Sequence, residues 1–199
     1  QVLQCPYDYE KGRLIVREMT DLLVLDLVEK RLVTDQMVLT VGYDIENLSD
    51  PKIAKNYKGD VTVDHYGRRV PKHAHGNVNL NRQTSSTKLI IDAVMELYDR
   101  IVNPNLLVRR INVVANHLVD ESSVAEEASF EQLDLFTDYQ ALQKQRAEEN
   151  EVLAKERKLQ EAMLQVKKKY GKNAMLKGMN LQEGAMTRER NNQIGGHKA

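Results

Sequence analysis

Two stretches with helical apolar spacing, each lying between β-rich runs, constrain the fold of the first 120 residues most strongly. In the first stretch, residues 10–32, apolar residues such as Ile15, Met19 and Leu22 recur at steps of three or four. The second, residues 87–102, carries a wider apolar stripe, and Ser85-Ser86 can cap its start. The β-rich runs around them are residues 2–7, 37–43, 77–84 and 106–118.

The order strand, helix, strand, insertion, strand, helix, strand predicts an α+β domain. Two right-handed crossovers place both helices on one face of a four-stranded sheet. Leu39, Val41 and Tyr43 are expected to face those helices, because side chains alternate along a strand. The opposite face then carries mainly Asn, Thr, Arg and Gln, which makes a good platform for nucleic acid.

The composition and the expected organisation of the chain change after residue 120. We expect a domain over residues 1–120, with an insertion at 45–75 that contains a small hairpin around Tyr66-Gly67. Residues 121–137 are acidic and are predicted to form a linker. Residues 138–199 are predicted to form a long helix, since 138–170 lack Gly and Pro, followed by a basic tail that is either a disordered arm or a docking peptide.

Composition narrows the function further. No apolar run approaches the roughly 20 residues that span a bilayer, no signal peptide opens the chain, and Cys5 is the only cysteine, so a cytoplasmic protein is expected. The net charge of zero hides a basic block, residues 52–88, with 8 basic and 2 acidic side chains. This block is suited to phosphate, although a solvated loop would have the same composition.

No catalytic set and no metal site stand out. His73 and His75 lie on one side of an extended segment and are the only candidate pair of metal ligands. Neither a cysteine nor a nearby acidic pair completes a site, so we predict no catalytic residue, no metal and no cofactor in this chain.

Three segments together resemble a known family. These are NLNRQTSSTK (79–88), TKLIIDAVMELYDRIV (87–102) and VRRINVVANHLV (108–119). They are similar to the little-finger domain of Y-family translesion DNA polymerases of the UmuC/ImpB/MucB/SamB type, with Asn112 where Gly is usual. The long insertion resembles the UmuC-like branch of Gram-positive bacteria.

The resemblance implies a domain that grips primer-template DNA through backbone phosphates, without base readout. It implies that the parent protein is a DNA-directed DNA polymerase, a nucleotidyltransferase of DNA repair and the SOS response, whose upstream palm uses Mg²⁺ and is absent here. This chain alone is therefore not expected to catalyse polymerisation. Together with two arginines of the basic block, the expected DNA contacts are Thr40, Arg68, Arg69, Arg82, Thr84, Ser85, Ser86, Arg109 and Arg110.

The stretch EQLDLFT resembles the short peptide by which bacterial polymerases bind the sliding clamp. The resemblance implies that Leu135 and Phe136 enter an apolar pocket of the clamp, with Leu133 beside them and Gln132 at the edge; Asp134 completes the pattern. A linker would raise the effective concentration of the peptide near the DNA-bound domain. Alternatively, these residues pack on the domain or begin the long helix.

Two other functions stay open. The strand and helix order also describes an RNA-binding module of the RRM type, which stacks bases on aromatic residues of its central strands; here these strands offer only Tyr43. The chain also fits a helical adaptor, in which residues 138–199 bind an unidentified partner and the sheet only supports them.

Overall fold

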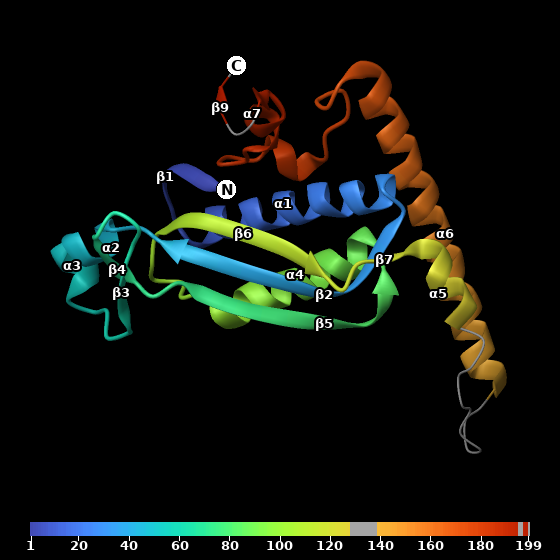
Figure 1. Cartoon of the computed structure of the whole chain (residues 1–199), viewed down its shortest axis with the longest axis horizontal. Helices are drawn as coiled ribbons and strands as arrows, with labels where there is room; N and C mark the ends of the chain where they lie inside the picture. Colours follow the sequence, from blue (N-terminus) through green and yellow to red (C-terminus); the bar gives the residue numbers. More distant parts are fainter. Residues whose placement is uncertain (128–138, 195–196, 199) are drawn as a thin grey trace.

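The computed structural model describes residues 1–127, 139–194 and 197–198 (Figure 1). Its main body is a twisted antiparallel sheet with two long helices on one face. A small subdomain stands at one end of the sheet, and a long helix runs past the other end. The elements are β1 (Val2–Tyr7), α1 (Tyr9–Glu29), β2 (Leu32–Tyr43), α2 (Glu46–Ser49), α3 (Pro51–Ala54), β3 (Val61–Val63), β4 (Arg69–Pro71), β5 (Ala74–Thr84), α4 (Thr87–Ile101), β6 (Val108–Asn116), β7 (Val119–Asp120), α5 (Glu121–Glu127), α6 (Tyr139–Tyr170), η2 (Gly178–Leu181), α7 (Thr187–Asn191), β8 (Gln193–Ile194) and β9 (His197–Lys198).

The strands of the main sheet lie in the order β1-β6-β2-β5, and every neighbouring pair is antiparallel. The predicted α+β class is thus confirmed. The short strand β7 adds a fifth member, because Leu32 and Val33 at the start of β2 pair with it. Since those pairings lengthen β2, this strand begins five residues before the predicted run at 37–43.

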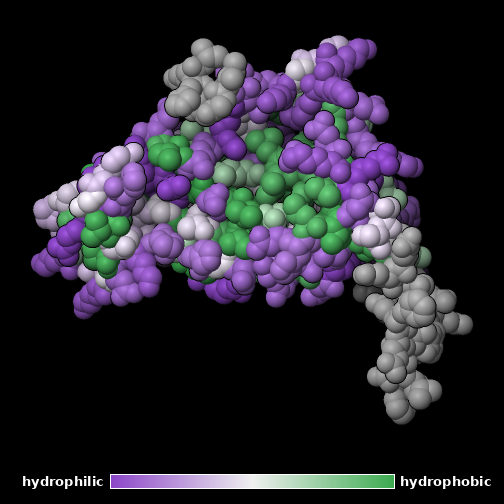
Figure 2. All heavy atoms as spheres, in the orientation of Figure 1, coloured by the Kyte–Doolittle hydropathy of each residue, from purple (hydrophilic) through white to green (hydrophobic). Residues whose placement is uncertain are grey.

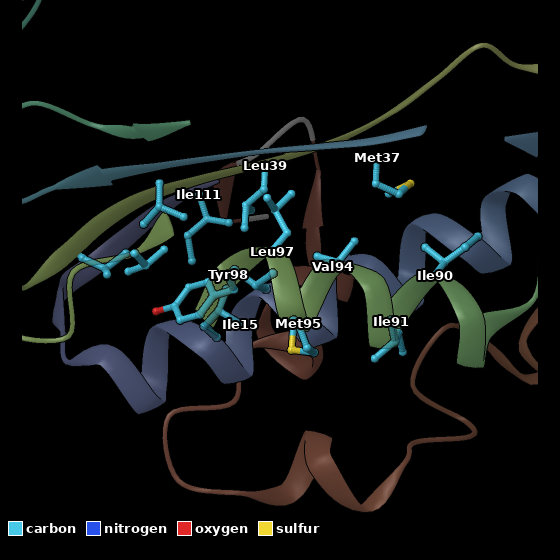
Figure 3. Close-up of a cluster of buried hydrophobic side chains, with 14 of the residues drawn as sticks. Ile15, Met37, Leu39, Ile90, Ile91, Val94, Met95, Leu97, Tyr98 and Ile111 are labelled. Carbon is cyan, nitrogen blue, oxygen red and sulfur yellow. The ribbon is translucent and has the colours of Figure 1, made fainter. Parts of the chain in front are cut away.

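The core lies between the sheet and the two helices α1 and α4 (Figure 3). Leu39 of β2 and Ile111 of β6 point down onto α4, and Ile15 of α1 approaches from the side; none of the three is measurably exposed. Val41 and Tyr43 are buried with them, so the predicted split of the two faces of β2 is correct. Ser86 caps α4 as predicted, by accepting a hydrogen bond from the Leu89 N–H at 3.3 Å.

The insertion forms the subdomain at the end of the sheet. It comprises α2, α3 and the β3–β4 hairpin, which turns at Tyr66-Gly67 as predicted. Asn47, which is fully buried, ties it to the sheet: its amide donates to the Leu107 carbonyl at 2.9 Å and its Oδ1 accepts from the Leu107 N–H at 2.7 Å. These paired hydrogen bonds fix α2 against the residue that precedes β6.

The C-terminal third packs against the domain. The long helix is confirmed as α6, and the tail beyond it lies along the outer side of α1 (Figure 1). Glu18, only 1% exposed, accepts hydrogen bonds from the Asn180 amide and the Met186 N–H, both at 2.7 Å, and Lys177 is paired with Asp21. Of the two forms predicted for the tail, the structure shows docking, and the surface it occupies is this chain's own helix.

The start of the predicted linker is also ordered into a helix. Residues 121–127 form α5, because Asp120 caps it by accepting from the Ser122 N–H at 2.9 Å and Glu121 is paired with Arg157 of α6 at 2.7 Å. In the described part of the chain, no helix is both long and apolar enough to cross a membrane.

Candidate nucleic-acid interface

The face of the sheet that the helices leave uncovered carries a network of polar side chains. Asn116 of β6 donates to Gln36 of β2 at 2.9 Å, and Gln36 donates to Asn79 of β5 at 2.8 Å, so three strands are linked side chain to side chain. Thr40 and His75, which are opposite each other in β2 and β5, are joined at 2.9 Å. This polar face matches the predicted platform and holds its side chains in fixed positions.

A cleft of about 1220 Å³ opens where this face meets the insertion. Thr40, Arg109, Arg110 and Asn112 line it from the sheet. The hairpin side is contributed mainly by His65, Tyr66, Arg68, Val63, Val70 and Pro71. The cleft therefore unites four of the nine predicted DNA contacts, namely Thr40, Arg68, Arg109 and Arg110.

The charges in the cleft are partly balanced within the protein. Asp44 lies 3.6 Å from Arg109, whose guanidinium also donates to the Gln4 carbonyl at 3.1 Å. Arg110 is exposed and makes no ion pair with any described residue. Arg69, at the start of β4, is exposed in the same way but does not line the cleft. Arg110 and Arg69 are thus the two predicted contacts best placed to meet a phosphate.

The hairpin turn is held by one carboxylate. Asp64 accepts from the N–H groups of Tyr66 and Arg68, both at 2.9 Å, and from the Arg68 guanidinium at 2.8 Å. The hydrogen bond from the Arg68 side chain holds the pKa of Asp64 below its usual range. Gly67 has φ of +77°, a conformation that favours glycine and lets the turn close.

The other predicted contacts, Arg82, Thr84, Ser85 and Ser86, lie under or against α6 in this structure. Thr84, Ser85 and Ser86 are each less than 9% exposed. Ser86 Oγ donates to Glu156 at 2.6 Å, and Arg157 donates to Ser85 Oγ at 3.3 Å. The hydroxyl of Thr84 accepts from the Ser86 N–H at 3.0 Å, so in this conformation none of the three hydroxyls is open to a phosphate.

Arg82 is engaged by the same helix. Its guanidinium is paired with Glu149, which lies about two turns before Glu156 along α6. Glu156 also accepts from the Lys88 N–H at 2.9 Å, at the first turn of α4. Two carboxylates of α6 thus occupy the positions where DNA phosphates were expected. No local sequence pattern indicates these contacts, because they join residues about 70 positions apart.

Among the described residues, no cluster of three or more His, Cys, Asp or Glu side chains is arranged to hold a metal ion. The ring centroids of His73 and His75 lie 6.4 Å apart in an edge-to-face arrangement, and His75 is hydrogen-bonded to Thr40. The predicted clamp peptide, Gln132, Leu133, Asp134, Leu135 and Phe136, lies outside the described residues.

Tyr66 was not among the predicted site residues. Its side chain is 78% exposed at the tip of the hairpin, where Arg68 stacks over the ring at 4.9 Å. The available signal was an aromatic residue next to Gly in a predicted turn that two arginines follow.

Comparison with known proteins agrees with this picture. A comparison with curated proteins gave no match. The family model described as the impB/mucB/samB family C-terminal domain matches residues 5–135, well over half of the chain's 199 residues. The match covers the whole sheet except the first three residues of β1, both covering helices and the insertion. The chain therefore belongs to the impB/mucB/samB family and is a C-terminal part of a Y-family DNA polymerase.

Proposed function

We propose that this chain is the DNA-binding and clamp-binding part of a translesion polymerase of the UmuC-like, Gram-positive type, and that its sheet domain is a little finger. The observation that carries the proposal is the family match over residues 5–135, on a domain whose sheet leaves a polar face uncovered. The domain holds primer-template DNA during damage bypass in the cytoplasm. The chemistry of nucleotide transfer, with its Mg²⁺ ions, belongs to the polymerase palm.

The basic surface beside the cleft supports the DNA part of the proposal. Residues 52–72 of the insertion carry six basic and two acidic side chains. Arg110 on the sheet and Arg69 on the hairpin have no ion-pair partner among the described residues, so a phosphate can approach them without breaking an existing pair. Contacts of this kind give affinity without sequence preference.

The DNA contact is tested by replacing Arg110 with alanine and measuring fluorescence anisotropy with a labelled primer-template at several salt concentrations. We expect weaker binding to every DNA sequence and a salt slope smaller by about one counterion. Arg188→Ala is the matched control, because Arg188 is exposed on α7, in the tail that lies along α1, and the charge change is the same. Equal loss in both variants would remove Arg110 from the interface.

We further propose that residues 132–136 bind the sliding clamp. The support is the sequence pattern, and the family match reaches Leu135, the fourth residue of the peptide. Calorimetry with purified clamp compares the native chain with the double variant Leu135→Ala/Phe136→Ala. Loss of binding is expected, because hydrophobic anchors dominate such contacts; equal binding by the two chains would refute the assignment.

The RNA-binding alternative is weaker on structural grounds. Tyr43, the aromatic residue that the central strands offer, is 8% exposed and packs in the core. Its hydroxyl accepts from the Asn103 N–H at 2.9 Å. A base cannot stack on a ring that is buried on the helix side of the sheet.

A further inference from the structure

The two walls of the cleft differ in chemistry. The sheet wall presents Arg109, Arg110, Thr40 and Asn112, which are polar or charged. The hairpin wall presents Val63, which is 62% exposed, and the ring of Tyr66. Figure 2 shows hydrophobic residues on the surface at this end of the molecule, over the insertion. The cleft is also lined by Asp44, Glu46 and Asp64, but Asp44 lies 3.6 Å from Arg109 and Asp64 is paired with Arg68 in the hairpin turn. Arg110 on the sheet wall and the Tyr66 ring on the hairpin wall are thus the groups that suit an anionic and a flat part of one ligand.

The ring of Tyr66 is positioned in advance of any ligand. Asp64 binds the N–H groups on both sides of the turn, so the backbone that carries the ring is fixed. Arg68 lies over the ring at 4.9 Å, and the ring of His65 meets it edge-on at 5.4 Å. Because these contacts leave the side chain 78% exposed, most of the ring is open for stacking.

The exposure of Tyr66 is not shared by most tyrosines of the domain. The hydroxyls of Tyr9, Tyr43, Tyr57 and Tyr98 each make a hydrogen bond inside the protein. The Tyr66 hydroxyl makes none with the described residues, so the packing of the domain does not account for an aromatic residue at this position.

We propose that this cleft binds an unpaired nucleotide of the DNA, with its base stacked on Tyr66 and its phosphate directed toward Arg110. Bases inside a duplex are already stacked on their neighbours, whereas an unpaired base offers a free face. A basic surface that follows the backbone, combined with an aromatic platform, is how proteins hold single strands without reading sequence. The volume of about 1220 Å³ exceeds the roughly 300–1,000 Å³ usual for small-molecule pockets, which favours a polymer.

This inference rests on the proposed DNA binding and adds the single-stranded template as the element recognised. It is tested by fluorescence anisotropy of the full chain with two labelled DNAs, a blunt duplex and the same duplex with a single-stranded template overhang. The variants are Tyr66→Ala and Tyr66→Phe. Tyr170→Ala is the matched control, because Tyr170 is also exposed, at 67%, and also has a cation over its ring, Lys169 at 5.1 Å.

We expect Tyr66→Ala to weaken binding of the overhang DNA about ten-fold, within the range for loss of one base stack, and to leave blunt-duplex binding unchanged. Tyr66→Phe keeps the ring and should bind like the native chain, as should Tyr170→Ala. If Tyr66→Ala binds the overhang DNA as tightly as the native chain, the stacking site is refuted while DNA binding stands. If the native chain binds neither DNA, the proposed function itself is refuted, and this inference with it.

Discussion

Glycine at position 12 sets how closely α1 approaches its neighbours. A Cβ built there would lie 2.8 Å from the Tyr98 hydroxyl and 3.2 Å from Val108 Cγ2. The Tyr98 hydroxyl needs that place because it donates to the Tyr9 carbonyl at 2.8 Å. From the sequence, Gly12 weakens only the first turn of a helix; its actual role depends on α4 and β6, which lie far along the chain.

Gly12→Ala is therefore expected to destabilise the domain, although alanine favours helix by about 1 kcal/mol. Overpacking against Tyr98 and Val108 outweighs this gain, and we expect a net loss of about 1–2 kcal/mol in urea unfolding. Gly178→Ala is the control, because a Cβ at Gly178 would meet nothing within 4 Å and its stability should change little. A Gly12→Ala protein as stable as the native chain would contradict the packing described.

The Asp64 turn gives a pH-dependent prediction. Because the pKa of Asp64 in the folded protein is lowered, its contribution to the hairpin is present at neutral pH and is lost as the pH falls through that lowered pKa. Carboxyl NMR should place its midpoint below the ordinary value of 3.8. Arg68→Ala removes the main cause and should raise the midpoint; an unchanged midpoint would show that Arg68 does not act on Asp64.

At the level of whole elements, α6 covers part of the predicted interface. Glu149 holds Arg82, and Glu156 holds Ser86 and the first turn of α4. The lack of Gly and Pro predicted α6 correctly. The residues Leu159, Met163, Val166 and Tyr170 recur along it at heptad steps, and this apolar seam indicates packing on this chain or on a partner. The seam did not predict which surface the helix packs on. In the structure only part of it is buried: Met163 is 5% exposed, whereas Leu159 and Tyr170 are 60% and 67% exposed. The polar contacts of α6, rather than its seam, set its position on the domain.

Glu149→Gln is expected to strengthen DNA binding two- to five-fold and to make it more salt-dependent by about one counterion, because Arg82 then becomes available. Glu151→Gln is the matched control: it lies on the same helix, changes charge equally and breaks only an ion pair with Lys155 at 2.6 Å. Equal changes in anisotropy for the two variants would assign the effect to net charge alone and exclude Arg82.

The docked tail yields a prediction about stability. Glu18→Ala leaves the Asn180 amide and the Met186 N–H without their acceptor, which should cost about 2 kcal/mol and release the tail. Limited trypsin digestion should then cut faster at Lys172 and Lys177. Glu10→Ala, an exposed change on the same helix, should leave both the melting temperature and the digestion rate as they are. Slow cleavage in Glu18→Ala would mean that other contacts hold the tail.

For the molecule as a whole, the local patterns of the first 120 residues were sufficient to predict the layered domain. Alternation in β2 separated Leu39 and Val41 from Thr40, and the structure has them on opposite faces. Single-residue roles at the interface were less predictable. Arg109 and Arg110 are adjacent in sequence, yet one is near Asp44 and the other has no ion-pair partner among the described residues. Such differences arise from contacts between distant segments, which no local pattern contains.

The most direct test of the proposed function compares ligands for the native chain. Fluorescence anisotropy is measured with a labelled primer-template DNA and with a single-stranded RNA of the same length, each over a range of salt concentrations. We expect the primer-template to bind more tightly, with an association constant that falls linearly with salt on logarithmic axes. Tighter binding of the RNA, or DNA binding that is absent at low salt, would contradict the assignment of this chain as the DNA-gripping part of a translesion polymerase.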